Sequence, residues 1–178
     1  MATWKSRGLR GSLLEEMINR TNDQYAIMKL ALMQKIPTPI TPIRMNQETR
    51  HITLAYFEQK STVDYIGAVQ GLPVCFDAKE CAADTFPLAN IHAHQREFMA
   101  GFEKQGGIAF ILIYWKKHDC FYYLRFADLM RFQKRQEDGG RKSIRFDELD
   151  EGFRIISAQS VLIPYLDYIQ KDLDLREA

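Results

Sequence analysis

The chain has 178 residues, of which 46% are apolar and 26% are charged, and its formal net charge is +1. These values are typical of a globular protein and fit a single domain spanning residues 1–178. No run approaches the roughly 18–20 apolar residues that cross a bilayer, and the basic N-terminus lacks the apolar core of a secretory signal. Three cysteines without CxxC spacing argue against a disulfide framework and a zinc site, so we expect a reducing, cytoplasmic location.

The first part of the chain is predicted to contain a helix, a proline-rich segment and a strand. Ser12–Leu32 is predicted to be a helix, because Ser12 and Glu15 have the spacing of a capping box. In Lys35–Arg44, three prolines remove backbone donors and fix φ, which excludes a helix or a central strand. We therefore expect an extended, projecting segment here, followed by a strand at His51–Phe57, whose side chains alternate in polarity.

A β-hairpin is predicted from Thr62–Val69 and Leu72–Lys79, because Gly71 in the turn between them tolerates a positive φ. The elements expected after it are a helix at Asn90–Lys104, strands at Gly107–Trp115 and Cys120–Phe126, and helices at Ala127–Gln136 and Pro164–Leu173. Strands gathered in mid-chain between helices favour an α/β fold with a mixed central sheet flanked by helices.

The predicted turn brings two carboxylates together. If Gln70 and Gly71 are the two loop residues, Asp64 faces Asp77, and Lys79 leaves the same face of the strand as Asp77. Like charges opposite each other destabilise a sheet, so either one carboxyl is protonated or a divalent cation lies between the two. Hard oxygen ligands suit Mg²⁺. Two carboxylates and an ammonium therefore predict a metal-assisted phosphodiester hydrolase, in which Lys79 holds the attacking water or neutralises developing charge.

Two of these features also have a simpler interpretation. Asp64 and Asp77 can be edge-strand acids that face water, with Lys79 as a surface cation. The segment Arg131–Arg145 holds six basic and two acidic residues, so it is either a basic face for nucleic acid or a solvated loop.

Other catalytic classes receive little support from the sequence. His92 and His94 look like a metal pair, but residues i and i+2 of a helix point about 200° apart, so at most one of them would face the site. The chain contains no GxxxxGK[ST] motif, which argues against a nucleotide-driven motor.

Motifs along nearly the whole chain resemble one nuclease family. In order, they are RG-x-x-LE, TN-x-x-Y, KIPTPI, AYFEQKSTVDY-x-G, F-D-AKE, FPL-x-N-x-H-x-HQ and GGRKSIR-x-DEL. On these motifs the chain resembles the RecU-type Holliday junction resolvases of the PD-(D/E)xK nuclease superfamily. The resemblance implies a restriction-endonuclease-like core, a protruding proline-containing stalk at about residues 33–57 and a flexible basic arm at 1–11.

The resemblance also implies roles for individual residues. Asp64 and Asp77 would bind the metal, Mg²⁺ or Mn²⁺ in its place, with Gln95 and the backbone carbonyl of Val63 as further ligands. Glu15 would approach the same site from the first helix. Val63 stands where relatives carry Thr, and Asp77 replaces the commoner Glu, which shifts the metal slightly. The DNA contacts implied are Arg7, Arg10, Lys35, Arg44, Phe57, Lys60, Arg141, Lys142 and Arg145, with Phe57 either stacked on unpaired bases or facing the core.

The function implied is a structure-selective endonuclease that resolves four-way DNA junctions by paired, symmetric cuts during recombination and repair. Two opposed cuts need two active sites related by a two-fold axis, so we expect a homodimer. The expected partners are junction DNA and recombinase or branch-migration proteins, with no membrane. The expected location is the cytoplasm, in association with the nucleoid, for a protein encoded by a bacterium or a phage. Two alternatives remain: another nuclease of the superfamily that acts on duplex or flapped DNA, and a non-catalytic DNA-binding module.

Overall fold

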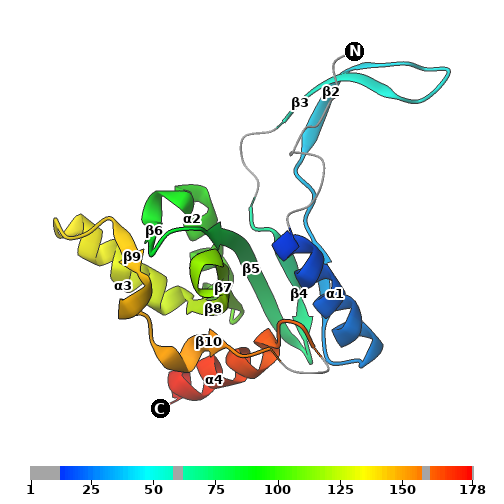
Figure 1. The fold of residues 1–178 in the computed structure, drawn as a ribbon. Coiled ribbons are helices and arrows are strands. Elements are labelled where there is room, and N and C mark those ends of the chain that lie inside the picture. Colours follow the sequence, from blue (N-terminus) through cyan, green and yellow to red (C-terminus); the bar gives the residue numbers. More distant parts are fainter. Residues whose placement is uncertain (1–12, 58–61, 158–160, 178) are drawn as a thin grey trace.

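The structure, a computed structural model, describes residues 13–57, 62–157 and 161–177 and contains a six-stranded sheet in the order β1-β4-β5-β7-β8-β10 (Figure 1). The sheet strands are β1 (Leu32–Lys35), β4 (Tyr65–Val69), β5 (Leu72–Cys81), β7 (Ile108–Trp115), β8 (Cys120–Arg125) and β10 (Arg154–Ile155). Two further pairs are β2 (Ile40–Met45) with β3 (Ile52–Phe57) and β6 (Thr85–Pro87) with β9 (Ser143–Arg145). The helices are α1 (Leu13–Ile27), α2 (Ala93–Lys104), α3 (Phe126–Glu137) and α4 (Tyr165–Glu177), with 3₁₀ turns at Leu88–Asn90, Lys116–His118, Phe146–Glu148 and Glu151–Phe153.

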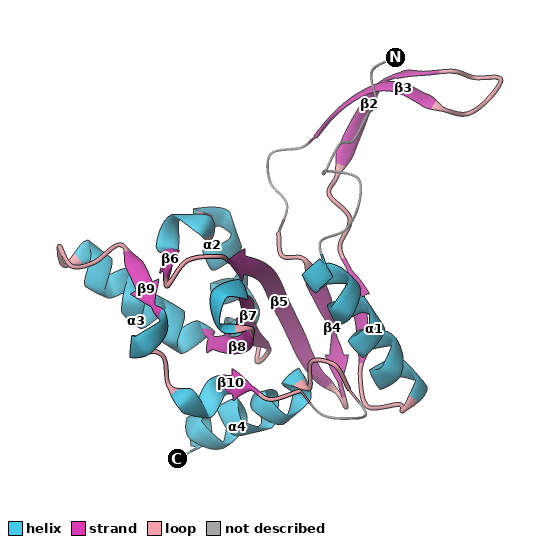
Figure 2. Cartoon of the chain, in the orientation of Figure 1, coloured by secondary structure: helices cyan, strands magenta, loops and turns pink. Residues whose placement is uncertain are grey.

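The sheet is mixed, since β5 and β7 run parallel while the other neighbouring strands are antiparallel. Helices flank it, and the β2–β3 hairpin extends away from it (Figure 2). These features confirm the predicted α/β class with a mixed central sheet and a protruding proline-containing segment.

Three predicted helix boundaries are wrong. The helix expected at Pro164–Leu173 continues to Glu177 as α4. The helix expected at Ser12–Leu32 ends at Ile27, because Lys29 adopts a left-handed φ of 58° and the chain then enters β1, which pairs with β4. Ser12, the expected cap, lies outside the described residues. The helix expected from Asn90 begins at Ala93, because residues 88–90 form a 3₁₀ turn and the next two residues are extended.

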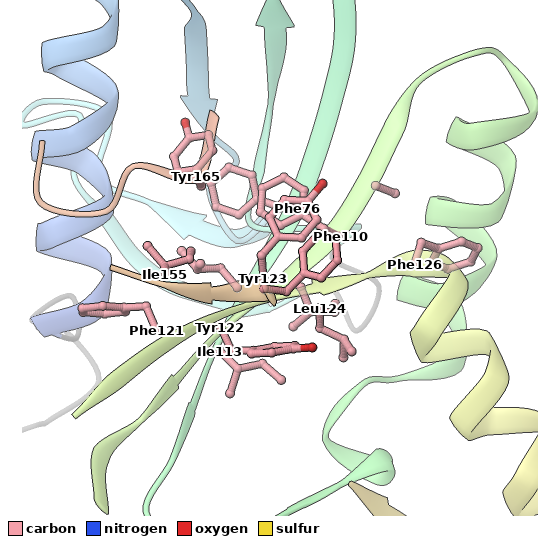
Figure 3. Packing of buried hydrophobic residues seen from close by; sticks show 14 of the residues in the cluster. Phe76, Phe110, Ile113, Phe121, Tyr122, Tyr123, Leu124, Phe126, Ile155 and Tyr165 are labelled. Atoms are coloured by element: carbon pink, nitrogen blue, oxygen red, sulfur yellow. The ribbon is translucent and has the colours of Figure 1, made fainter. Parts of the chain in front are cut away.

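A column of stacked aromatic rings crosses four strands on one face of the sheet. The ring centroids of Tyr65 and Phe76 lie 4.7 Å apart. The next rings of the column, labelled in Figure 3, are 4.8 Å apart between Phe76 and Phe110 and 4.2 Å apart between Phe110 and Tyr123. Tyr165, at the start of α4, covers this column with its ring 5.2 Å from that of Phe76. Such pairs add about 0.5–1.5 kcal/mol each beyond their burial. The column therefore holds β4 and β5 in a fixed register, and residues next to Phe76 in β5 point to the opposite face.

The β2–β3 hairpin is predominantly apolar and exposed. Its large apolar side chains are 45–58% exposed: Ile40, Ile43, Met45, Ile52, Leu54 and Tyr56. At the tip, the Asn46 side-chain oxygen accepts the backbone N–H groups of Glu48 and Thr49, which closes the turn locally. The hairpin thus keeps its shape through backbone bonds and its tip turn, and it presents apolar groups to the surroundings.

Among the helices of the described ranges, none has both the length and the apolar character needed to cross a bilayer. All three cysteines, Cys75, Cys81 and Cys120, are free. Burial raises the pKa of the Cys75 thiol to about 12, which keeps it protonated and unreactive at neutral pH.

Candidate active site

The β4–β5 turn fixes the position of the two carboxylates. Gln70 and Gly71 adopt φ values of 48° and 92°, as a two-residue type I′ turn requires. The pairing of Tyr65 with Phe76 confirms the predicted register, so Asp64, one residue before β4, comes opposite Asp77. The Asp64 carboxylate reaches across to β5, where its Oδ2 accepts the backbone N–H of Ala78 at 2.9 Å.

Asp77 is fully buried, and its two oxygens contact different side chains. Its Oδ1 accepts the Gln95 side-chain amide N–H at 3.0 Å, and its Oδ2 contacts the Lys79 ammonium. Burial raises the pKa of the Asp77 carboxyl to about 7, the Asp64 carboxyl adds to the rise, and Lys79 opposes it. The two acids are therefore close enough to interact, and a proton or a cation between them relieves their repulsion.

The start of α2 orients Gln95. The Gln95 carbonyl accepts the backbone N–H of His92 at 3.0 Å, which turns its NH₂ group toward Asp77. Our expectation that His92 and His94 point far apart is wrong. Their rings are stacked with centroids 5.5 Å apart, because His92 precedes the helix and has an extended backbone.

A cavity of about 360 Å³ adjoins Asp64. Its lining residues are Glu15, Lys35, Ile36, Pro37, Thr38 and Asp64. The Lys35 ammonium binds the Glu15 carboxylate at 2.7 Å. Glu15 thus reaches the side of the site at which Asp64 lies, while Val63 is buried beside Asp64.

The donor set fits a hard divalent cation that keeps much of its water. In the part of the chain that the structure describes, no group of three or more His, Cys, Asp or Glu side chains is arranged to hold a metal. Mg²⁺ commonly needs only one or two carboxylates, with water and substrate phosphate as its other ligands. Asp64 and Asp77 would hold such an ion, which would replace the proton favoured by the raised pKa of Asp77.

The sequence matches a known family over most of its length. The sequence model of the family described as Recombination protein U matches residues 9–171. The chain belongs to this family.

Curated relatives bear the name Holliday junction resolvase RecU. The relative from Pediococcus pentosaceus is 39% identical over 172 residues, which cover 94% of this chain and 86% of the relative. The relative from Bacillus pumilus is 41% identical over 165 residues, covering 90% and 78%. The solved structure of Hjc, a Holliday junction resolvase of Archaeoglobus fulgidus, has a TM-score of 0.40 at 8% identity and covers 66% of this chain and 78% of its own. That similarity is too distant to inform the site.

The motif GGRKSIR-x-DEL, residues 139–149, overlaps the basic run Arg131–Arg145, which is largely neutralised in the structure. Arg131–Arg145 forms the end of α3, a turn and β9, so it is not simply a solvated loop. Its basic side chains pair with acids as follows: Arg131 with Asp128, Lys134 with Asp138, Arg135 and Arg141 with Glu148, and Arg145 with Asp147. Arg141 and Arg145 would have to exchange these partners for phosphates, whereas Lys142 is exposed on the turn.

The other expected DNA contacts lie in three places. Lys35 stands beside the active site, and Arg44 is exposed on β2. Phe57 ends β3 opposite Ile40, and only its backbone is described. Arg7, Arg10 and Lys60 lie outside the described residues.

Sequence reasoning missed strand β1, and with it a direct link to the site. The backbone N–H of Ile36 donates to the carbonyl of Asp64 at 2.7 Å, extending the β1–β4 ladder to the candidate metal ligand. Gly67 was the available signal, because a Cβ there would clash with the carbonyl of Leu32. A glycine inside a strand often marks the close approach of another backbone.

Proposed function

We propose that the protein is a Holliday junction resolvase, an endonuclease that cuts opposed strands of a four-way DNA junction. The observation that carries the proposal is the facing pair of Asp64 and Asp77, with Lys79 in contact with Asp77. Membership of the Recombination protein U family and the names of the curated relatives support the same substrate. The projecting hairpin supports a branched substrate over plain duplex, since a duplex nuclease has no need of it.

The proposed cofactor is Mg²⁺, with Mn²⁺ as a substitute, held by Asp64 and Asp77. When bound, the ion would supply Lewis acidity at the scissile phosphate and lower the pKa of the attacking water. Gln95 holds Asp77 in one orientation, and its own orientation is set by the N–H of His92. Lys79 carries the positive charge nearest Asp77 and would stabilise the charge that develops on the phosphate.

The hairpin would enter the open centre of the junction. Apolar and aromatic side chains such as Leu54 and Tyr56 suit contact with the faces of unstacked bases, and they are exposed. Arg44 on the same hairpin would contact phosphates, which position the DNA without reading its sequence. Binding is then expected to depend on branched shape and to weaken steeply as salt rises.

Two symmetric cuts require two copies of this site, so the proposed working unit is a homodimer. Recombinases or branch-migration proteins are the other proposed partners, because they act on the same DNA structure. The proposed location is the bacterial cytoplasm, close to the chromosome or to phage DNA. The relatives come from bacteria, which supports that location.

A cleavage assay with Asp77→Ala tests the proposal. The substrates are a synthetic four-way junction, a duplex and a flapped duplex of the same sequence, each with Mg²⁺ and with a chelator. We expect the parent protein to cut the junction in opposed strands only with Mg²⁺, and the variant to bind it without cutting. Lys104→Gln, at the exposed end of α2, is the matched control and should cut like the parent.

Three outcomes would contradict the proposal. If Asp77→Ala cuts the junction as fast as the parent, Asp77 does not belong to the active site. Preferred cutting of duplex or flap would favour another nuclease of the superfamily, and binding without cutting by the parent would favour a non-catalytic module.

Replacing residues 40–57 with a short Gly/Ser turn should abolish the preference for junctions, and an unchanged preference would reject the role of the hairpin.

A further inference from the structure

The hairpin is tied to the candidate active site at its base, a segment that we call the hairpin root and define as Lys35–Thr38. The N–H of Ile36 is bonded to the carbonyl of Asp64, one residue beyond the last pair of the β1–β4 ladder. Lys35 is bound to Glu15 of α1. The hairpin therefore leaves the sheet from a point that is directly hydrogen-bonded to a proposed metal ligand.

The root and Pro39, which joins it to the hairpin, form a short segment with two prolines. Pro37 and Pro39 fix φ and lack a backbone donor, so this stretch resists bending into other conformations. β2 begins at Ile40, directly after it. On the other leg, β3 ends at Phe57 and the chain rejoins the sheet at Tyr65, next to Asp64. The first leg is thus hydrogen-bonded to the backbone of Asp64, so a displacement of this leg would act on Asp64.

The cavity beside Asp64 lies between the root and the catalytic face. Residues 35–38 line it together with Glu15 and Asp64. Its volume of about 360 Å³ is at the lower end of the range for ligand clefts, so it is large enough for a segment of sugar-phosphate backbone. Lys35 supplies a cation at its wall, which is held by Glu15 when no phosphate is present.

We propose that the hairpin root is a spacer that sets where the strand is cut, measured from the crossover point of the junction. The hairpin would lie at the crossover point, and the cavity beside Asp64 would bind the backbone of the DNA strand that leaves the crossover. The hydrogen bond between Ile36 and Asp64 would keep the hairpin and the cavity at a fixed distance from each other. This proposal rests on the proposed function and adds to it a determinant of the cleavage position.

Lengthening the root is the direct test. One glycine inserted between Thr38 and Pro39 adds about 3.4 Å of extended chain, roughly one base step along a DNA strand. The substrates are immobile four-way junctions with several arm sequences, so that base sequence does not decide the cut. We expect the main cut to move by about one nucleotide, or the cuts to spread over neighbouring positions. The matched control is a glycine inserted between Gln105 and Gly106, in the exposed turn after α2, which should keep the parental position.

A second variant removes only the hydrogen bond. Ile36→Pro deletes the N–H that donates to the backbone carbonyl of Asp64. The preceding residue, Lys35, is already in the extended conformation that a following proline requires. We expect junction binding to persist and the cut position to spread, with a roughly fivefold drop at the parental nucleotide. Ile36→Ala shortens the same side chain but keeps the N–H, so any spreading of the cuts in Ile36→Pro beyond that in Ile36→Ala comes from the lost hydrogen bond. A variant that is partly unfolded or slow would give less of every product in equal proportion. The distribution of products therefore distinguishes a changed cut position from a loss of folding or rate.

The result that would overturn the inference is a sharp parental cut position in both the root insertion and Ile36→Pro. If the parent protein fails to cut junctions at all, the proposed function fails instead. The two failures are therefore distinguishable in the same assay.

Discussion

The central sheet and the β2–β3 hairpin place apolar side chains in opposite environments. In the sheet, Phe76 and Phe110 are fully buried and stack against each other. In the hairpin, Leu54 and Tyr56 are about half exposed. Burial fixes the sheet residues whether or not DNA is present, whereas the described hairpin residues are held mainly by backbone pairing and a few local side-chain hydrogen bonds. Changes in the sheet should therefore affect folding, and changes in the hairpin should affect binding.

The candidate active site includes one residue of the buried sheet and one residue at the base of the exposed hairpin. Asp77 is held from the buried side by Gln95 and Lys79, and Asp64 is connected to the hairpin through Ile36. One proposed metal ligand, Asp77, thus lies within the sheet, and the other, Asp64, lies where the sheet meets the base of the hairpin. This arrangement would allow recognition of the junction to influence the geometry of the cutting site.

The largest expected effect is on folding. Phe110→Ala removes the middle of the aromatic column and should lower the free energy of unfolding by about 3–5 kcal/mol. Tyr56→Ala in the hairpin should change it by less than about 0.5 kcal/mol, because the side chain is half exposed. Denaturant titration of dilute protein measures both. Similar losses for the two variants would contradict the contrast between sheet and hairpin.

The next effect is a pH dependence of stability that comes from Asp77. Its pKa is about 7 in the folded protein and 3.8 for an ordinary Asp, so the folded state holds this proton more tightly than the unfolded chain does. Binding of this proton stabilises the folded state fully below about pH 4, and the stabilisation is lost as the pH rises toward 7. The difference between the two pKa values corresponds to roughly 4 kcal/mol in the free energy of unfolding.

Asp77→Asn should remove this slope. Measured with a chelator, the stability of the parent relative to the variant should fall between pH 4 and pH 8. Mg²⁺ should restore stability at pH 8 in the parent and not in Asp77→Asn, since a cation takes the place of the proton. A constant difference across this pH range would show that Asp77 is not held in its protonated form.

Much of the site could be predicted because it depends on a local turn. Gly71 specifies a two-residue loop, the loop sets the register, and the register places Asp64 opposite Asp77. Lys79 follows from the two-residue period of a strand. These steps need only residues within one hairpin, which explains why they survive comparison with the structure.

The features that were missed depend on residues far apart in the sequence. Strand β1 has no clear alternation and becomes a strand only by pairing with β4. The basic run at 131–145 is neutralised in part by Glu148, which lies beyond the end of the run. The pKa of Asp77 depends on burial by the whole fold. Sequence periodicity contains none of this tertiary information.

A smaller effect is expected on catalysis at the buried end of the site. Lys79→Gln removes the ammonium that contacts Asp77 and should lower kcat for junction cleavage by roughly 10²–10³-fold, with junction binding nearly unchanged. Lys104→Gln serves as the control for loss of one positive charge. A parallel loss of binding and cleavage in Lys79→Gln would indicate that this lysine acts as a general DNA contact.

The smallest effect is expected for the exposed cation of the hairpin. Arg44→Gln should leave the free energy of unfolding unchanged, because the side chain is exposed on β2. If Arg44 contacts one phosphate, junction affinity should fall modestly and the slope of log affinity against log salt should become shallower by about one. Binding titrations at several salt concentrations measure that slope, with Lys104→Gln again as the control. An unchanged slope would mean that Arg44 does not contact the junction backbone, and the apolar side chains would then carry the hairpin's contribution to binding.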